Sequence, residues 1–445
     1  MKPQILISAP TAGSGKTLFA MGLMRVLKKR GLAVQPYKCG PDFIDSQYLS
    51  IAADCDSVNL DAWMSSNTHV QHLYNKYGEQ ADICVTEGVG GLFDGYRRMQ
   101  GSTAEMAGLL NLPVVLLINA RIAGYSVAPL IYGFKNFYAG IHIAGVVFNQ
   151  ISSPAHFSHL REACSDANVD CLGYLPNMEE FKLPAKHSVV SVANRRSLDE
   201  LANAVAAQIE KTVDVNRLLN RCNRNFPCPY TLPYSSDTDF DAFRAPLRKI
   251  KIAIARDPAF SFTYRENIAQ LAKIGEIVHF SPLYGYELPE ADLIYLPGGY
   301  PELFARQLHR RRKMMDSLKE YAERGGKILA ECGGMVFLGR TLKSKENGTA
   351  YAMSNILPID FIMPSAPKLC TGYRKLVTPH LELKGSEFHY STILKDDTPN
   401  TGWTSAPLAN WKGVENDTFF YRYKNVIATY AHWYWGDKDI LKLWQ

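Results

Sequence analysis

Three features are scarce in this sequence: paired cysteines, long apolar runs and an excess of one charge. The nine cysteines among 445 residues are odd in number and follow no repeating spacing, which argues against a disulfide framework and for a reducing compartment. The most apolar segment, residues 112–122, contains Asn119 and Arg121 and is too short to span a bilayer. Lys and Arg number 49 against 43 Asp and Glu, without clustering. We therefore expect a cytoplasmic protein that binds neither membranes nor nucleic acid.

Short β-rich runs alternate with longer amphipathic stretches, which is typical of parallel sheets covered by helices on both faces. The predicted strands are residues 4–9, 33–38, 83–86, 114–118, 143–148 and 171–174 in the first half, and 251–255, 277–280, 293–296 and 328–330 in the second. Because 445 residues exceed the size of one usual core, we expect two α/β domains, residues 1–190 and 248–445. A helical and irregular linker, residues 191–247, would join them.

A glycine-rich turn lies between the first predicted strand and a predicted helix at residues 16–29. Backbone N–H groups of such a turn point at phosphate oxygens, and the helix dipole adds to the attraction. Lys16 would reach the terminal phosphates, and the Thr17 hydroxyl would ligate Mg²⁺. Pro10 stands where the common consensus has glycine, which points to longer-loop variants similar to those of dethiobiotin synthetase and the partition ATPases. The loop residues predicted to bind nucleotide are Thr11, Ala12, Gly13, Ser14, Gly15, Lys16 and Thr17.

Polar residues follow three more of the predicted strands. Glu87 comes at the tip of strand 83–86 and is the expected second anchor of Mg²⁺. Asp42 and Asp45 lie in the turn after strand 33–38, where either would hold Mg²⁺, position a substrate or cap a helix. Asp94 follows a glycine run and would lie on a loop over the substrate or mark a turn. Asn149 would hydrogen-bond an adenine edge or cap the next segment.

The second domain carries a cysteine between a predicted strand and an apolar run. The tight Glu-Cys-Gly-Gly turn of residues 331–334 would present the Cys332 thiol as a nucleophile. His432, at the end of an apolar strand, is the best-placed base, and a thiolate–imidazolium pair would activate the sulfur. The N–H groups of Gly299 and Gly333 would form the oxyanion hole. A buried inert cysteine and an aromatic-box histidine are the alternatives when each residue is judged alone.

The turn at residues 331–334, the Pro-Gly-Gly-Tyr-Pro-Glu segment 297–302 and His432 resemble a class I glutamine amidotransferase domain. Most members of that class carry a glutamate two residues after the histidine. Tyr434 occupies that position here, as in the subgroup of cobyrinate and cobyric acid synthases. Further motifs in the order 38–45, 87–95, 255–262 and 387–391 resemble the cobyrinate a,c-diamide synthase family over nearly the whole chain.

This resemblance implies a dethiobiotin synthetase-like sheet in the first domain and a glutaminase fold in the second. It implies that ATP, Mg²⁺ and glutamine serve to amidate the a and c carboxylates of cobyrinate, through an acyl phosphate, in cobalamin biosynthesis. The residues that it places at the corrinoid are Asp42, Phe43, Ile44, Asp45 and Asp94.

Several alternatives stay open at this point. The same chemistry could act on hydrogenobyrinate or a nickel-sirohydrochlorin. From another class, the chain could be a partition-type ATPase switch with a degenerate second domain, although an intact pair of Cys332 and His432 argues against it. A homodimer is a further hypothesis. His389 has either a structural or a functional role.

Overall fold

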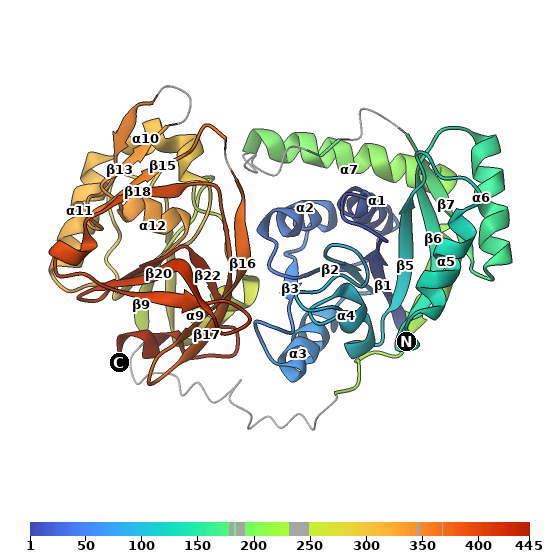
Figure 1. Ribbon diagram of the computed structural model, residues 1–445, viewed down its shortest axis with the longest axis horizontal. Helices are drawn as coiled ribbons and strands as arrows, with labels where there is room; N and C mark the ends of the chain where they lie inside the picture. Colours follow the sequence, from blue (N-terminus) through green and yellow to red (C-terminus); the bar gives the residue numbers. More distant parts are fainter. Residues whose placement is uncertain (178–181, 184–191, 231–248, 345–347, 367) are drawn as a thin grey trace. The chain divides into compact units, whose positions relative to one another are not determined.

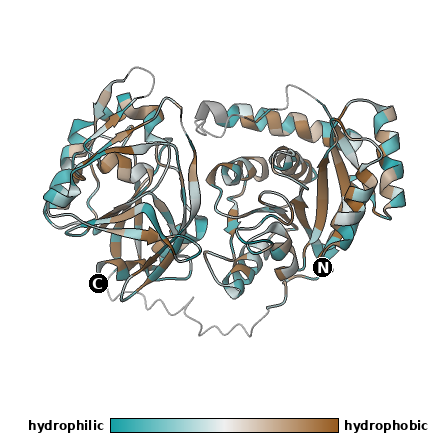
Figure 2. Cartoon of the chain, viewed as in Figure 1, coloured by the Kyte–Doolittle hydropathy of each residue, from teal (hydrophilic) through white to brown (hydrophobic). Residues whose placement is uncertain are grey.

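The computed structural model describes residues 1–177, 182–183, 192–230, 249–344, 348–366 and 368–445. The chain divides into two compact units, Met1–Tyr234 and Ser235–Gln445 (Figure 1). Each unit is built on its own central sheet, and apolar residues predominate in the middle strands (Figure 2). Among the residues that the structure describes, no helix has the length and apolar character needed to cross a membrane.

A parallel sheet with the strand order β3-β2-β4-β1-β5-β6-β7 forms the centre of the first unit, and the short β8 pairs antiparallel with β1. Its central strands are almost wholly buried, as expected for strands covered on both faces. The predicted strands of this half are confirmed, with small differences at their ends. The strands are β1 (Lys2–Ser8), β2 (Val34–Cys39), β3 (Val58–Leu60), β4 (Ile83–Glu87), β5 (Pro113–Asn119), β6 (His142–Ile151), β7 (Cys171–Pro176) and β8 (Asn223–Arg224).

Eight helices of the described residues belong to this unit. They are α1 (Lys16–Lys29), α2 (Phe43–Ala53), α3 (Asn67–Gly78), α4 (Thr103–Leu109), α5 (Val127–Asn136), α6 (Pro154–Asp166), α7 (Val192–Thr212) and α8 (Val215–Arg221). Helix α7 packs along α1 and contacts α2 (Figure 1), and Arg25 of α1 pairs with Asp199 of α7 at 2.6 Å. The structure therefore places α7 in the first unit, whereas the sequence suggested a linker at residues 191–247. Residues 231–247 of that segment lie outside the described residues.

The second unit has a mixed sheet with the order β10-β9-β11-β12-β21-β20-β19-β16-β17-β22. Strands β10 to β21 are parallel to one another, and from β20 onward the pairing is antiparallel. The predicted strands of this half correspond to β9 to β12. The strands of the sheet are β9 (Ile250–Ala255), β10 (Gly275–Phe280), β11 (Leu293–Leu296), β12 (Lys327–Glu331), β16 (Cys370–Val377), β17 (Glu382–His389), β19 (Thr404–Ala409), β20 (Glu415–Tyr423), β21 (Val426–Thr429) and β22 (Ala431–Tyr434).

A smaller sheet and short helices complete this unit. The sheet has the order β14-β13-β15-β18, from β13 (Thr341–Lys343), β14 (Ala350–Ala352), β15 (Ile359–Ile362) and β18 (Thr392–Asp396). The helices are α9 (Arg265–Ile274), α10 (Ala305–His309), α11 (Arg312–Glu323) and α12 (Gly333–Leu338), with 3₁₀ turns at Pro301–Phe304, Thr398–Asn400 and Ile440–Trp444. Helix α12 follows β12 directly, so the turn between them lies at the carboxyl edge of the parallel strands.

Candidate active sites

The phosphate loop joins β1 to α1, and its own polar contacts hold it in shape. Ser14 Oγ donates to the Thr11 carbonyl at 2.8 Å, and the Asn149 amide, near the end of β6, donates to the Ser14 carbonyl at 2.9 Å. Gly15 has a φ of 93°, and a Cβ at this position would collide with the Asn149 amide. Asn149 therefore supports the loop directly, and its contact with adenine stays a prediction.

Lys16 and Thr17 connect the loop to the end of β4. Lys16 Nζ donates to the Gly90 carbonyl at 2.5 Å, and Thr17 Oγ1 donates to Glu87 Oε1 at 2.7 Å. Glu87 is buried, and its Oε2 accepts no hydrogen bond from the part of the chain that the structure describes. A hydroxyl beside a buried carboxylate oxygen is the kind of donor set that Mg²⁺ prefers, so Thr17 and Glu87 fit this ion.

Lys38, at the end of β2, is a member of this site that the sequence did not single out. Its Nζ lies 2.9 Å from Glu87 Oε1 and 2.9 Å from Asp45 Oδ2. Burial opposes the charge on Lys38, but the carboxylates outweigh burial and raise the pKa of this lysine. Burial also raises the pKa of Glu87 to about 7, against the opposing effect of Lys38. Two acids and one base therefore share a buried charge network behind the phosphate loop.

The other residues predicted in this unit lie around the start of α2 and after β4. Asp42 caps α2, since its Oδ1 accepts from the N–H groups of Ile44 at 3.0 Å and Asp45 at 2.8 Å. Phe43 and Ile44 are buried. Asp94 is exposed, and its Oδ2 accepts from the Gly91 N–H at 3.0 Å. Their contacts with a corrinoid, and that of Asp42 with a metal, stay predictions.

In the second unit, Cys332 occupies the turn between β12 and α12. Its φ of 45° and ψ of −105° are unusual for a residue with a side chain, as at other strained turns that present a nucleophile. The N–H groups of Gly299 and Gly333 hydrogen-bond to the sulfur. The thiol itself lies 3.5 Å from the Phe388 carbonyl oxygen and donates to it. The structure thus brings together the predicted nucleophile and the two predicted oxyanion donors.

His432 approaches this turn from β22, a strand separate from the apolar strand β21 at whose end it was expected. In β22 it pairs with Ser386 of β17. The His432 ring is buried, and the backbone of Phe388, whose carbonyl accepts from Cys332, opposes the lowering of the His432 pKa by burial. A Cβ at Gly298 would lie 2.7 Å from His432 Nδ1, so only glycine leaves room for the ring. The sequence does not predict this close approach of His432 to Gly298. The signal for it is the position of Gly298, directly before the predicted oxyanion donor Gly299.

The electrostatics correct one expectation. Burial raises the pKa of the Cys332 thiol well above its usual value, and the charges of Glu302 and Glu387 add to this effect. Burial also lowers the pKa of His432 to about 3, with a further contribution from His389. The pair therefore rests as a neutral thiol and a neutral imidazole, rather than as the predicted thiolate–imidazolium pair, because both groups are shielded from water.

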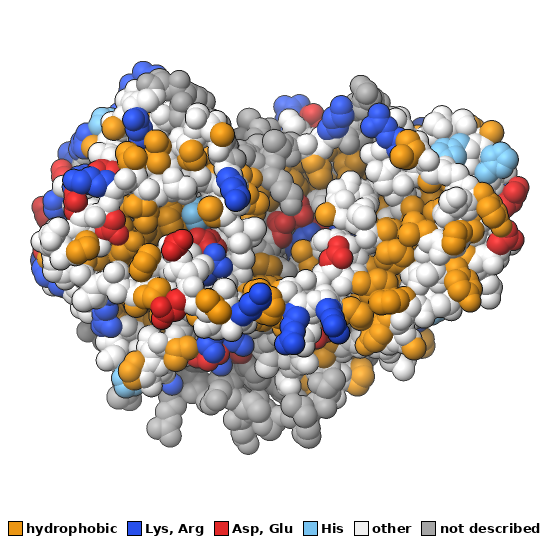
Figure 3. Space-filling model, in the orientation of Figure 1, with side chains coloured by type: hydrophobic (Ala, Val, Ile, Leu, Met, Phe, Trp, Pro, Cys, Tyr) orange, Lys and Arg blue, Asp and Glu red, His pale blue; other side chains and the backbone are white. Residues whose placement is uncertain are grey.

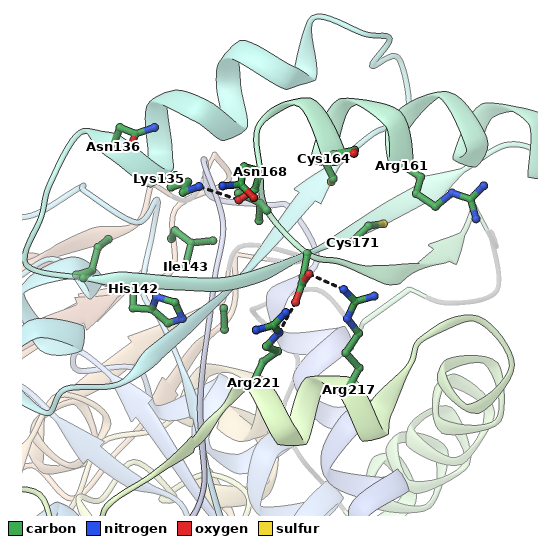
Figure 4. Close-up of a pocket in the computed structure, with 15 residues that line it drawn as sticks. Lys135, Asn136, His142, Ile143, Arg161, Cys164, Asn168, Cys171, Arg217 and Arg221 are labelled. Atoms are coloured by element: carbon green, nitrogen blue, oxygen red, sulfur yellow. Dashed lines mark hydrogen bonds and ion pairs between the residues drawn. The ribbon is translucent and has the colours of Figure 1, made fainter.

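A separate cavity of about 640 Å³ lies in the first unit, where β6 and β7 begin (Figure 4). Inside it Asp170 pairs with Arg221 and, at 2.5 Å, with Arg217, while Lys135 donates to the Asn168 carbonyl at 2.7 Å. The phosphate loop lies at the opposite, carboxyl ends of the strands. This cavity is therefore not part of the nucleotide site.

Together the two sites define a glutamine-dependent amidotransferase joined to a nucleotide-binding domain. A CobQ/CobB/MinD/ParA nucleotide binding domain matches residues 5–190, and a CobB/CobQ-like glutamine amidotransferase domain matches residues 251–440. The chain belongs to the cobyrinate a,c-diamide synthase family, which confirms the resemblance read from the sequence motifs.

Three relatives span nearly the same length. The chain is 35% identical to the cobyrinate a,c-diamide synthase of Dehalococcoides mccartyi (strain ATCC BAA-2266), over 99% of this chain and 97% of that protein. It is 34% identical to the enzyme of that name from Saccharolobus solfataricus, over 96% and 97%. It is 37% identical to the hydrogenobyrinate a,c-diamide synthase of Brucella anthropi, over 88% and 89%.

Proposed function

We propose that this chain amidates the a and c carboxylates of cobyrinate, with ATP and glutamine as co-substrates and Mg²⁺ as the metal. The observation that carries the proposal is the Cys332 sulfur, which lies in a strained turn beside the N–H groups of Gly299 and Gly333, next to Gly298, whose lack of a side chain leaves room for the His432 ring. The phosphate loop in the same chain would bind the ATP that the second half-reaction uses. The names of the relatives supply the substrate.

The second unit would release ammonia from glutamine. Cys332 gives its proton to His432 as the sulfur attacks the amide carbon, and the carbonyl oxygen becomes an oxyanion at the N–H groups of Gly299 and Gly333. His432 then protonates the departing ammonia. Water hydrolyses the thioester to glutamate and returns the thiol. A neutral resting His432 is ready to accept the first proton.

The first unit would activate the corrinoid carboxylate. A carboxylate oxygen attacks the γ-phosphorus of ATP, ADP leaves and an acyl phosphate forms; ammonia then attacks the acyl carbon and phosphate leaves. Lys16, which contacts the Gly90 carbonyl in the structure, would neutralise charge on the transferring phosphoryl group. Thr17 and Glu87 would hold Mg²⁺, whose charge would offset that of the phosphates.

Hydrogenobyrinate is the second candidate substrate, because the relative from Brucella anthropi that bears this name is as similar to the chain as the cobyrinate enzymes are. The two substrates share their carboxylates and differ in the metal of the ring. A nickel-sirohydrochlorin would need the same chemistry. The ATPase switch has less support, since a glutamine amidotransferase domain matches residues 251–440, which contain both Cys332 and His432.

The test is mass spectrometry of cobyrinate incubated with Mg-ATP and either glutamine or ammonium, with wild type and the Cys332→Ala variant. We expect a diamide from wild type with both nitrogen sources and from the variant with ammonium alone. Parallel reactions contain hydrogenobyrinate or nickel-sirohydrochlorin. If wild type amidated hydrogenobyrinate or nickel-sirohydrochlorin but not cobyrinate, the substrate would be reassigned. If wild type formed neither an amide nor glutamate, the proposal would be overturned in favour of the ATPase switch.

We further propose that the chain is cytoplasmic and forms a homodimer. All nine cysteines lie among the described residues and none forms a disulfide, which suits a reducing compartment. For the dimer, the support is an exposed apolar area around α5, in the N-terminal unit (Figure 3). Its most exposed members are Ile122, Tyr125, Tyr132 and Phe137.

A further inference from the structure

The cavity at the start of β6 and β7 is lined by more positive than negative charge (Figure 4). Of the described residues that line it, Asp170 is the only carboxylate, and four side chains are cationic. The cationic side chains are Lys135 of α5, Arg161 of α6, and Arg217 and Arg221 of α8. Because the walls of a protein cleft have a low dielectric constant, charges of one sign within it concentrate counter-ions from solution. The cavity therefore favours an anion.

Asp170 uses only part of the hydrogen-bonding capacity of the two arginines of α8. Its Oδ1 lies 2.5 Å from Arg217 Nη2, and its Oδ2 pairs with Arg221 Nε. A guanidinium has five N–H donors in a planar fork, and the described part of the chain shows no other hydrogen-bond or ion-pair partner for either one. Both side chains are about half exposed, and Figure 4 shows them meeting at the Asp170 carboxylate. Their remaining N–H groups are thus open to a ligand.

Two further groups show that the positive charge is not compensated within the cavity. Lys135 Nζ donates to the Asn168 carbonyl at 2.7 Å, and a carbonyl is neutral, so this contact does not neutralise the lysine. His142, the first residue of β6, lies in the same cavity. Burial lowers the pKa of its ring, and the charges of Arg224, Arg221 and Lys135 lower it further. A field that opposes a proton on His142 attracts an anion beside it.

The size of the cavity and the chemistry of its donors indicate the class of ligand. A volume of about 640 Å³ lies within the range of about 300–1,000 Å³ that is typical of small-molecule pockets. A phosphate monoester carries about −1.5 to −2 charges at pH 7 and presents three acceptor oxygens. The planar guanidinium fork of arginine matches two phosphate oxygens at once. A phosphate group therefore fits these donors better than a monocarboxylate, which would bring no more charge than Asp170 already does.

We propose that Arg217, Arg221 and Lys135 bind a phosphate group in this cavity, either as inorganic phosphate or as part of a small metabolite. Asp170 positions the two guanidinium groups, and the phosphate oxygens take their remaining N–H donors. The site is distinct from the nucleotide site, because the phosphate loop lies at the opposite ends of the parallel strands. The inference adds a binding site to the chain and does not depend on the proposed function.

The test follows the His142 ring by histidine-selective NMR during titration with inorganic phosphate or ribose 5-phosphate in a phosphate-free buffer. The resonance is assigned from His142→Gln. Bound phosphate should raise the pKa of His142, because a nearby negative charge favours the protonated ring. We expect a saturable shift at millimolar ligand or below. Phosphate at the nucleotide site would lie at the other end of the strands and leave this resonance unchanged, so Lys16→Ala should give the same titration as wild type.

Two substitutions in the site should change the affinity in opposite directions. Arg221→Gln should weaken phosphate binding about 10-fold, because a charge-assisted hydrogen bond is lost. Asp170→Asn should strengthen it about threefold or more, because the competing negative charge is removed and both guanidinium groups are released to the ligand. Lys251→Gln is the control, since it removes an exposed charge that is paired with a carboxylate, Glu290, at 2.9 Å in the second unit. This control should bind phosphate as wild type does.

Tighter binding of ribose 5-phosphate than of inorganic phosphate would assign the ligand as a metabolite, and equal or weaker binding would assign it as inorganic phosphate; both results support the site. A succinate titration separates phosphate recognition from a general attraction of anions, and succinate binding as tight as phosphate would overturn the proposal. So would an unchanged His142 resonance at millimolar phosphate, or equal affinity in wild type and Arg221→Gln. An Asp170→Asn variant that is folded by circular dichroism and binds no more tightly than wild type would also overturn it.

Discussion

At the scale of single residues, Gly298 controls whether His432 can reach the nucleophile. A methyl group at this position would lie 2.7 Å from Nδ1, and a buried ring in β22 has no free space into which to move. We predict that Gly298→Ala lowers glutamine hydrolysis about 100-fold or more, because general acid–base catalysis by His432 is lost. Ammonium-dependent amidation, which does not use His432, should persist, and both activities can be followed by coupled assays.

The control for this prediction is Gly133→Ala in α5, where an added Cβ meets nothing within 4 Å. This variant should behave as wild type in both assays. If Gly298→Ala retained glutamine hydrolysis, the ring of His432 would have to tolerate a displacement that the present packing does not allow, and its assignment as the base would fail.

Glu331, the residue before Cys332, makes stability depend on pH. Its oxygens accept from Tyr295 Oη at 2.7 Å and from the Trp433 N–H at 3.0 Å, yet burial raises its pKa from 4.5 to about 8. Between these values the folded chain keeps a proton that the unfolded chain loses, so the free energy of unfolding falls as pH rises. The slope is up to about 1.4 kcal/mol per pH unit for this group.

We predict that Glu331→Gln removes this slope, so the stability of the variant relative to wild type should rise between pH 5 and 8. Denaturant unfolding of both proteins at several pH values measures the difference. The comparison cancels the contribution of Glu87, whose pKa is also raised and which is present in both proteins. Parallel pH curves would show that Glu331 is ionised throughout this range.

At the scale of elements, the contact between α1 and α7 depends on a glycine in the middle of a helix. A Cβ at Gly22 would lie 2.8 Å from Ile209 Cδ1 and 3.1 Å from Val205 Cβ. Gly→Ala in an exposed helix stabilises by about 1 kcal/mol. Here we predict a loss of roughly 1–3 kcal/mol, because overpacking outweighs helix propensity. Thermal unfolding of Gly22→Ala should therefore show a lower midpoint, and a higher one would mean that α7 does not pack tightly on α1.

Much of the fold was predictable from local patterns, and the exceptions depend on distant contacts. The strand before the phosphate loop and helix α1 follow from an apolar run, a glycine-rich turn and helical periodicity, and α1 has the predicted bounds. The polar sequence of helix α7 gives a weak local signal and predicts a linker, whereas the apolar side of this helix is buried against Gly22 of α1. The antiparallel half of the second sheet was not predicted, since strand order there is set by pairing across long sequence separations.

In the candidate sites, too, the residues with a local sequence signature were predictable and those brought together by distant contacts were not. Cys332, Gly299 and Gly333 were found from the sequence because a nucleophile turn and a double-glycine turn have local signatures, and the structure brings their atoms together. The ion pair of Lys38 with Glu87 is not predictable from the sequence, because it joins residues of two strands 49 positions apart and no local motif indicates such a pairing. The neutral state of the catalytic pair also needed the structure, since burial decides it.

At the scale of the whole molecule, the exposed apolar area around α5 bears on assembly. The side chains of Tyr132 and Phe137 are 61% and 70% exposed. Exposing this apolar surface to water is unfavourable, and packing against a second copy of the chain would bury it. We predict that wild type elutes as a dimer in size-exclusion chromatography with light scattering, and that Tyr132→Ser with Phe137→Ser shifts it to monomer. Tyr286→Ser, at an exposed tyrosine of the second unit, is the control. A wild-type monomer at micromolar concentration would contradict the dimer.

The buried, protonated state of Cys332 has a consequence for chemical labelling. Alkylating reagents select exposed and ionised sulfur atoms. Cys55, Cys171 and Cys370 are partly exposed, and a hydrogen bond from Cys164 lowers the pKa of Cys171. Iodoacetamide should therefore mark these thiols first, and a proteome-wide reactivity profile would pass over the nucleophile. A glutamine-shaped electrophile, which itself draws the proton from sulfur to His432, is the probe that would single out Cys332.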